Sequence, residues 1–453
     1  MTRSFLWTGV RLAALCSLLL LAACGGKQIP PRDGIPSPHL GTIRDMRSFP
    51  QDLTVFAQQA GADTPLLDSQ AQAEQDARFN RIFFGPWDMR KTSIRKRDVE
   101  IYFRKAKGYK YGDVRWTQDD WDAMRANAGL KSFPNTAMYG ITVRNADLRE
   151  MPSHTPRFSE PTPDPRINPF DYFQYSLLPV GTPVFIAHTS RDGNWYYVET
   201  PVAAGWVDAN DIGIVDEAFE ASYKTGSYVA VLRDNVPLPG SLAGQVNIGT
   251  VLPLAPSQSD NTRLAVLVPV KNGSRANVVT LTLAHEDAAI KPLPMTPAQV
   301  ALIGNVMMGQ RYGWGGMFGD RDCSALTREL LTPFGIWLPR NSLSQARSGR
   351  RIMLDGMSIK EKEKGILRDG VPFLTLVWLR GHIMLYVGPY KGRPAIFHNV
   401  WGVRTVEGAS DNERFVIGRA VVSSITPGSE LRNLYRTTTF GDRVNSITVL
   451  GGR

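Results

Sequence analysis

The spacing of hydrophobic residues changes twice along the chain. Residues 68–84 and 117–128 carry apolar side chains at helical spacing, and Gly85-Pro86 stops the first of these segments. From residue 137 to about 292, short β-branched and aromatic runs alternate with Gly, Pro, Asp and Asn. Helical spacing returns at residues 298–308. The pattern therefore predicts a helical part, a strand-rich part and a final part that mixes both.

The predicted strands of the middle part are short. Residues 182–188 and 195–199 flank an Asp192-Gly193 turn, which predicts a hairpin. Further runs of this kind follow at residues 228–232, 250–254, 264–270 and 277–283. Many short strands at this spacing predict small β-barrels. About 155 residues provide room for two, although the sequence shows no strong internal repeat.

The final part opens with a capped helix and a glycine-rich loop. Thr296, Pro297 and Gln299 stand at the N-cap, first and third positions of a capping box. After the loop at residues 310–316, Cys323 directly precedes the apolar-periodic segment 325–331. Cys323 is therefore expected in the first turn of a helix, where the helix dipole favours a reactive thiolate.

Two histidines follow this cysteine in the chain. His382 begins a predicted strand at 382–387, and His398 ends another at 395–398. Pairing of these strands would bring both imidazoles to one end of a sheet, where one could take the thiol proton and later protonate a leaving amine. The alternative is that the cysteine and both histidines are buried structural residues. The remaining histidines are His39, His154, His188 and His285.

The start of the chain has the features of an export signal. Arg3 and Arg11 precede an apolar run at residues 12–23, which is too short to span a bilayer. The small residues before Cys24 resemble a bacterial lipobox, which implies that Cys24 is lipidated and becomes the mature N-terminus. The alternative is a plain signal peptide in which Cys24 is incidental. The Pro-rich residues 29–38 predict an extended tether.

Composition limits the remaining possibilities. A chain of 453 residues is too long to fold around one hydrophobic core, and its length predicts three or four domains. The formal charge of +10 favours anionic surroundings such as phospholipid or wall polymer, and export argues against nucleic acid as a partner. Of the three cysteines, Cys16 lies in the signal and Cys24 is the lipidated residue of the lipobox, so Cys323 is expected to be the free thiol of the mature chain.

Several motifs resemble those of the NlpC-type peptidoglycan cysteine peptidases. They are Tyr312-Gly313-Trp314-Gly315-Gly316, Arg321-Asp322-Cys323-Ser324, Leu338-Pro339-Arg340-Asn341-Ser342, Gly381-His382-Ile383-Met384 and Phe397-His398-Asn399. More narrowly, the chain resembles gamma-D-glutamyl-L-diamino acid endopeptidases that carry SH3-like domains before the catalytic one. Phe83-Phe84-Gly85-Pro86-Trp87 is similar to the helical stabilising segment of such proteins, and the hairpin after residue 182 is similar to the bacterial SH3-like module.

This resemblance implies a role for each site residue. Cys323 would be the nucleophile, His382 the general base and acid, and His398 the residue that orients His382. The resemblance also implies a pocket for the substrate's D-glutamyl residue and the residue before it, lined by Tyr312, Asp322, Ser324 and Ser342. The alternative keeps Asp322 as a helix cap and Tyr312 as packing. Ala325 departs from the glycine that the family often has there.

In such relatives the SH3-like domain closes one end of the groove, which implies a preference for short peptides with a free N-terminal L-alanine. An acidic or aromatic group from the first barrel would then meet the substrate amine. Asp171 and Tyr172 are the candidates for this contact.

The expected fold is multidomain α+β, with a helical N-terminal segment, two small SH3-like β-barrels and a papain-like cysteine peptidase domain. The predicted boundaries are 1–23 for the signal peptide, 24–40 for the tether, 41–135 for the stabilising domain, 136–215 and 216–292 for the barrels, and 293–453 for the peptidase.

The expected function is cleavage of the gamma-D-glutamyl-L-diamino acid bond of peptidoglycan stem peptides by a monomeric, exported protein. Its lipid would anchor it to a bacterial membrane facing the periplasm or wall, the outer membrane if the cell has one. No metal-ligand spacing or nucleotide fingerprint implies a cofactor. The alternatives are a catalytically silent wall-binding lipoprotein and a papain-like acyl or amide transferase.

Overall fold

The computed structural model describes residues 40–164, 168–255, 258–259, 261–406, 414–436 and 438–451. The predicted signal peptide, Cys24 and the tether up to His39 lie outside the described residues, so these assignments stay predictions. Within the described ranges, no helix has the length and apolar character that a membrane span requires.

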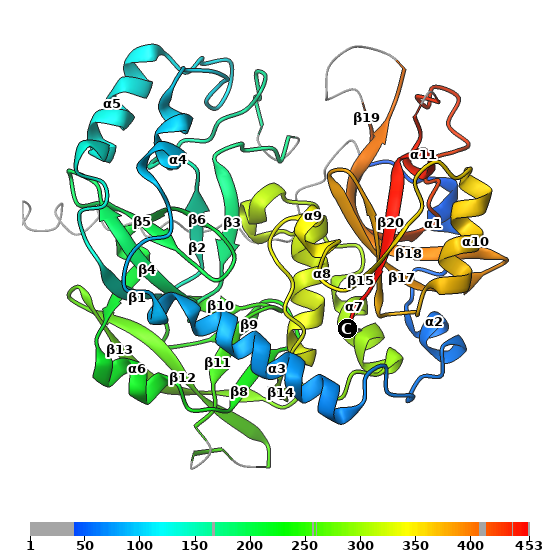
Figure 1. The fold of residues 1–453 in the computed structure, drawn as a ribbon, viewed down its shortest axis with the longest axis horizontal. Helices are drawn as coiled ribbons and strands as arrows, with labels where there is room; N and C mark the ends of the chain where they lie inside the picture. The colour runs from blue at the N-terminus through cyan, green and yellow to red at the C-terminus, as the bar shows by residue number, and fades with distance from the viewer. Residues whose placement is uncertain are drawn as a thin grey trace, which may run out of the picture. The chain divides into compact units, whose positions relative to one another are not determined.

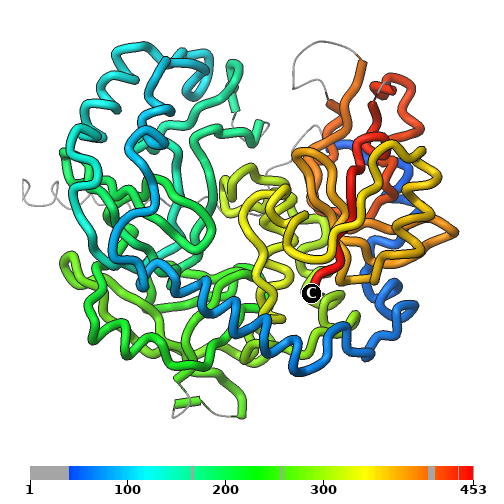
Figure 2. Tube along the Cα trace, in the orientation of Figure 1, coloured from blue at the N-terminus to red at the C-terminus, as the bar shows by residue number. Residues whose placement is uncertain are grey.

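The N-terminal helices pack against two different parts of the molecule. α1 (Arg44–Ser48) and α2 (Thr54–Gln59) lie against the C-terminal part, where α2 contributes to the main hydrophobic core and Met46 of α1 packs on a smaller one. α4 (Lys96–Glu100) and α5 (Gln118–Ala128) belong to an aromatic core shared with the middle part. The long helix α3 (Ser69–Phe84) runs between them, as Figures 1 and 2 show. The helical segment therefore completes the cores of its neighbours.

The middle part consists of short strands, as the alternating pattern predicts. The strands of its larger sheet are β1 (Met138–Thr142), β2 (Ala146–Arg149), β3 (Gln174–Leu178), β4 (Pro183–Thr189), β5 (Trp195–Glu199), β6 (Ala204–Asp208), β7 (Ile212–Val215), β12 (Arg263–Asn272) and β13 (Arg275–Ala284). The smaller strands are β8 (Tyr228–Val231), β9 (Val236–Leu238), β10 (Gly244–Val246), β11 (Val251–Pro253) and β14 (Ala288–Lys291), and α6 (Glu217–Tyr223) precedes β8. The predicted hairpin is the antiparallel pair β4–β5.

Two hydrophobic cores lie within these strands. One is built from β2, β4, β5, β6 and β7 and includes Leu148, Val184 and Val198. The other is built around β8, β11, β12 and β14 and includes Val229 and Val266. A parallel contact of β13 with β7 joins the strands into one sheet of order β12-β13-β7-β1-β4-β5-β6-β2-β3. The two cores are thus separate, but hydrogen bonding is continuous between them.

The C-terminal part places helices on both faces of an antiparallel sheet. The sheet has the order β15-β20-β16-β17-β18-β19, and β17 to β19 lie beside one another in Figure 1. Its strands are β15 (Arg350–Met353), β16 (Thr375–Leu379), β17 (His382–Tyr390), β18 (Arg393–Arg404), β19 (Arg414–Ser423) and β20 (Val444–Val449). Its helices are α7 (Pro297–Met307), α8 (Cys323–Leu331), α9 (Ser342–Gln345), α10 (Ile359–Asp369) and α11 (Phe440–Arg443). The predicted class, multidomain α+β, is confirmed.

Alternation along β17 divides the core of this part in two. Ile383, Leu385 and Val387 pack with α7 and α8, whereas Met384 and Tyr386 pack with α10. Thr296 is the N-cap of α7, as predicted, because its side chain accepts the Gln299 N–H. β18 is longer than predicted, so His398 lies within the strand and not at its end.

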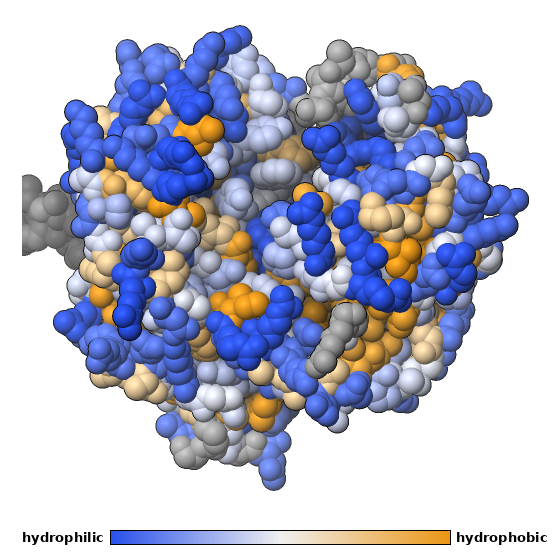
Figure 3. All heavy atoms as spheres, viewed as in Figure 1, coloured by the Kyte–Doolittle hydropathy of each residue, from blue (hydrophilic) through white to orange (hydrophobic). Residues whose placement is uncertain are grey.

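The segment before α8 lies directly on the first barrel. Gly315 and Gly316 have φ of 64° and 88°, which glycine adopts without strain. A Cβ on Gly316 would stand 2.5 Å from the Leu177 Cβ on β3. The glycine pair therefore permits the close approach that holds this loop. In the view of Figure 3, hydrophilic residues cover most of the visible face, with apolar residues in separate patches.

Gly316→Ala should lower the free energy of unfolding by about 2–4 kcal/mol, because it combines left-handed strain with overpacking against β3. Gly392→Ala is the matched control, since Gly392 also has positive φ (76°) but has no atom within 4 Å of an added Cβ. Gly392→Ala should lower the free energy of unfolding by only about 1–2 kcal/mol. Urea unfolding of both variants measures the difference, and equal losses would contradict the importance of the contact with β3.

Candidate active site

Cys323 is the first residue of α8, as the sequence predicts. Its N-cap, Asp322, accepts hydrogen bonds from the backbone N–H groups of Ser324 and Ala325 at 3.1 and 2.8 Å. The Cys323 thiol also has a hydrogen bond from the backbone of Ile383, the residue after His382. The structure therefore brings the start of α8 and the start of β17 together, with the thiol between them.

The two histidines are in direct contact. His382 Nε2 lies 2.8 Å from His398 Nδ1, and His398 Nε2 lies 2.9 Å from the Ser423 hydroxyl. The contact uses Nε2 of His382, so Nδ1 is the ring nitrogen left for another partner. Sequence analysis expected the two imidazoles to lie close together, and the structure brings them into contact, although His398 lies within β18 and not at the end of the sheet. It did not foresee Ser423.

Phe440 covers the pair of histidines. Its ring centroid lies 5.2 Å from that of His382 and 6.0 Å from that of His398. Phe440 begins α11, a short helix capped by Thr439 and Asp442. The pattern of the sequence gave no sign of this contact, because Phe440 lies far from every motif of the site. The aromatic cover keeps water away from the imidazoles.

Burial controls ionisation at this site. Cys323 is 7% exposed, and burial followed by the charge of Asp322 raises the pKa of its thiol to about 12. Burial, together with His398 and Arg443, holds the pKa of His382 well below its usual 6.5. Burial alone lowers the pKa of His398 to about 3. The buried site thus favours a neutral thiol and neutral imidazoles, which opposes the resting thiolate expected from the helix dipole.

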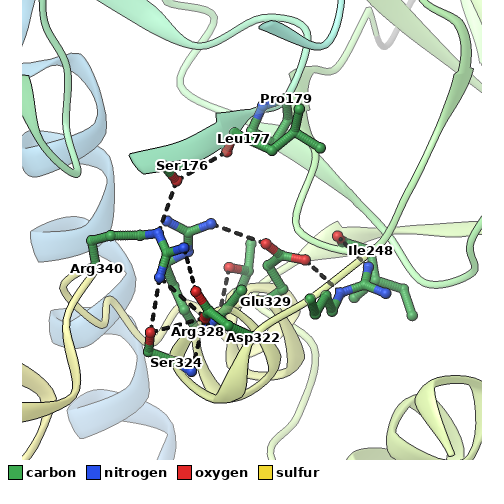
Figure 4. Close-up of polar contacts among 12 residues, drawn as sticks. Ser176, Leu177, Pro179, Ile248, Asp322, Ser324, Arg328, Glu329 and Arg340 are labelled. Atoms are coloured by element: carbon green, nitrogen blue, oxygen red, sulfur yellow. Dashed lines mark hydrogen bonds and ion pairs between the residues drawn. The ribbon is translucent and has the colours of Figure 1, made fainter. Parts of the chain in front are cut away.

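Asp322 is part of a buried polar network, which Figure 4 shows. Arg340 donates to both Asp322 oxygens, at 2.6 and 3.1 Å, and to the Ser324 hydroxyl at 2.8 Å. Burial works against ionisation of Asp322, but the pair with Arg340 outweighs it and holds the pKa of Asp322 below its usual range. Asp322 is therefore both a helix cap and the partner of Arg340.

Arg340 connects this network to the first barrel. Its Nε donates to the Ser176 hydroxyl on β3 at 2.9 Å. Arg340 stands in the Leu338-Pro339-Arg340 motif, but no role was predicted for it. A buried arginine is recognised only once its partners are known. The predicted contact of Asp322 and Ser324 with a substrate stays a prediction.

The other two predicted pocket residues are Tyr312 and Ser342. The Tyr312 ring packs against Phe170 and Trp401 at 5.9 and 6.0 Å. Burial, followed by the Cys323 side chain, raises the pKa of Tyr312. Ser342 is half-buried and begins α9, whose Gln345 donates to the Ser324 carbonyl at 2.8 Å. Their roles in binding stay predictions.

The two barrel candidates differ in their surroundings. Asp171 is 3% exposed, pairs with Arg149 at 2.9 Å and accepts the backbone N–H groups of Arg157 and Phe173. Its carboxylate is therefore occupied within the barrel. The Tyr172 ring is half-buried and lies 6.2 Å from that of Trp314, in the loop before α8. Tyr172 is the candidate that the structure brings near the site.

No group of three or more His, Cys, Asp or Glu residues that could hold a metal occurs among the described residues. A cysteine in the first turn of a helix, bonded to the start of an antiparallel strand that carries a histidine, is the arrangement of a papain-like cysteine peptidase. Three family models each match a part of the chain. Residues 309–419 match the NlpC/P60 family, residues 13–133 match the N-terminal stabilising domain of NlpC/P60 proteins, and residues 156–208 match an SH3 domain of the SH3b1 type.

The chain therefore contains an NlpC/P60 cysteine peptidase domain preceded by a stabilising domain and an SH3 domain. A solved NlpC/P60 endopeptidase from Photobacterium damselae subsp. piscicida has the same fold, with a TM-score of 0.78 and 24% identity over 91% of this chain and 99% of the other. An NlpC/P60 family protein from Bacillus cereus is more distant, with a TM-score of 0.41 and 16% identity over 61% and 81% of the two chains. No curated protein matches the chain.

The buried histidines should make stability depend on pH. Unfolded His398 has a pKa near 6.5, whereas the folded value is about 3, so between these values only the unfolded chain gains a proton. The free energy of unfolding should therefore fall by up to about 1.4 kcal/mol per pH unit as the pH drops below about 6.5.

The measurement is urea unfolding of the wild type and His398→Asn at pH 7.5 and 5.0. The variant lacks the buried imidazole of His398. On acidification its free energy of unfolding should therefore fall by about 2 kcal/mol less than that of the wild type. In the variant His382 loses the influence of His398, but burial, the main cause of its lowered pKa, remains. If the free energy of unfolding falls equally in both proteins, His398 accepts a proton in the folded state.

Proposed function

We propose that this protein is a peptidoglycan hydrolase that cleaves the bond between gamma-D-glutamate and the L-diamino acid of stem peptides. The observation that carries the proposal is the hydrogen bond between His382 and His398 beside the Cys323 thiol, in a domain of the NlpC/P60 family. The motif residues Tyr312, Asp322, Ser324 and Ser342, which resemble the specificity pocket of gamma-D-glutamyl endopeptidases, support the choice of bond.

The reaction begins with a neutral pair. As substrate displaces water, His382 Nδ1 takes the Cys323 proton and the sulfur attacks the gamma carbonyl carbon of D-glutamate. The backbone N–H of Cys323 is the proposed donor to the oxyanion. His382 then gives its proton to the leaving amine of the diamino acid, and a thioester remains. Water, activated by His382, hydrolyses the thioester and restores the thiol.

His398 contributes by holding His382. For His382 to accept a proton at Nδ1, its resting proton must be on Nε2, where His398 Nδ1 lies 2.8 Å away. The same contact stabilises the imidazolium that forms when His382 takes the thiol proton. A substrate amine would share the Asp322 carboxylate with Arg340, which already donates to both of its oxygens.

Wild-type protein should convert L-Ala-gamma-D-Glu-diaminopimelate to L-Ala-D-Glu and diaminopimelate, whereas Cys323→Ala should form no product because it lacks the nucleophile. Mass spectrometry of the purified peptide after incubation measures both. Ser446→Ala removes a buried hydroxyl elsewhere in the sheet and is the matched control.

Cleavage by Cys323→Ala would disprove the assigned nucleophile. Absence of cleavage by both proteins would favour a silent wall-binding protein. Product analysis with and without a nucleophilic amine distinguishes hydrolysis from acyl transfer, because a hydrolase releases L-Ala-D-Glu when no amine is added, whereas a transferase needs the amine as acceptor.

We also propose that Cys24 carries the lipid that anchors the exported protein. The small residues before Cys24 and the short apolar run support this assignment. In cells, wild-type protein should sediment with membranes, because two or three acyl chains give stable anchoring. Cys24→Ala should prevent lipidation and lose this attachment.

The measurement is fractionation with immunoblotting, together with incorporation of labelled palmitate. The control is Cys16→Ala. Cys16 lies within the apolar run that precedes Cys24, and its replacement should leave palmitate incorporation intact. Equal labelling of the wild type and Cys24→Ala would exclude Cys24 as the lipid site.

A further inference from the structure

The hydrogen bonds that begin at His382 continue through a buried chain. After His398, the Ser423 hydroxyl donates to the Ser424 carbonyl oxygen at 2.8 Å. His398, Ser423 and Ser424 have no exposed surface. Since solvent does not reach these groups, the position of each proton is decided by the protein groups themselves.

The single proton of Ser423 sets the order of all the others. A carbonyl oxygen only accepts, so this proton points to Ser424, and the Ser423 oxygen must accept from His398 Nε2 at 2.9 Å. His398 Nδ1 then has a lone pair and accepts from His382 Nε2 at 2.8 Å. His382 Nδ1 consequently keeps the lone pair that can take the Cys323 proton.

The opposite order would disable the base. If Ser423 donated to His398 Nε2, then His398 Nδ1 would carry a proton and donate it to His382 Nε2. His382 Nδ1 would be protonated and unable to accept from the thiol. Both orders preserve the contact between the rings, so the histidines by themselves do not choose between them.

We propose that Ser423 is a positioning residue that selects the productive tautomer of both histidines, because its own proton is held by the Ser424 carbonyl. Ser423 touches neither the thiol nor a substrate and acts only through His398. The inference rests on the proposed cysteine hydrolase, in which His382 is the base.

Helix α1 holds the far end of this chain. Asp45 is 4% exposed, and its Oδ2 accepts both the backbone N–H of Ser424 at 2.8 Å and the Ser424 hydroxyl at 2.6 Å. These two bonds fix Ser424, whose carbonyl orients Ser423. The N-terminal helical segment thus contributes to the proton order at a site built by the C-terminal domain.

Ser423→Ala removes the hydroxyl and should lower kcat on the tripeptide about 10- to 30-fold with KM nearly unchanged, because the buried His398 Nε2–H then lacks its acceptor and the unproductive proton order becomes the favoured one. Ser423→Thr keeps a hydroxyl and should retain most of the activity. Ser446→Ala is the matched control, since Ser446 is an equally buried serine of the same sheet that is bonded to Arg351. It should behave as the wild type.

A spectroscopic measurement tests the tautomer without activity. In protein labelled with ¹⁵N-histidine, the ring shifts of His398 should report a proton on Nε2 in the wild type, and those of His382 should report the same. His382→Asn and His398→Asn assign the signals. In Ser423→Ala, a fraction of each ring should move to the Nδ1-protonated form. Asp45→Ala should shift the same signals in the same direction but less.

The outcomes separate this inference from the proposed function. If the wild type leaves the tripeptide intact, the proposed hydrolase is wrong, whatever the tautomers are. If the wild type cleaves but Ser423→Ala matches it in kcat, or keeps both histidines fully protonated on Nε2, Ser423 does not select the tautomer and the inference is overturned. A fall in kcat equal to that of Ser446→Ala would overturn it as well.

Discussion

Burial of the histidine pair is the constraint on which the site depends. An imidazole that is shielded by Phe440 and by the sheet is costly to charge, so the pKa values of both rings are lowered. A neutral imidazole with one lone pair is a base only if that lone pair faces the thiol. The protein therefore has to control which nitrogen carries the proton, and hydrogen-bond partners that water cannot replace provide that control.

Ionic contacts hold the start of α8 against both barrels. Arg340 pairs with Asp322 and bonds to Ser176 of the first barrel, whereas Arg321 pairs with Asp234 of the second at 2.7 Å. Cys323 directly follows Arg321, which is fixed by Asp234, and Asp322, which is tied through Arg340 to Ser176. Loss of one member of a buried pair leaves an uncompensated charge, which makes such contacts sensitive to substitution. The barrels therefore contribute to the position of Cys323.

Much of this architecture could be predicted from the sequence, because local signals carry it. The Thr296 cap of α7, the hairpin β4–β5 and Cys323 in the first turn of α8 depend on residues close together in the chain. Ser423, Phe440 and the partners of Arg340 could not be predicted, since they reach the site from strands and helices far away in the chain. The resting thiolate was expected from the helix dipole. Burial is a property of the whole fold, and it reverses that expectation.

The packing of α1 and α2 has a consequence for how this protein can be divided. Leu53 and Phe56 have no exposed surface and belong to the same core as Leu330 of α8 and Phe397 of β18. Gln51 bonds to the backbone N–H and carbonyl of Val422, which satisfies part of an edge strand. A peptidase domain cut out at residue 293 would carry a hole in its interior and an unprotected strand edge. Exchange of catalytic domains between proteins of this kind therefore has to transfer two distant pieces of sequence together.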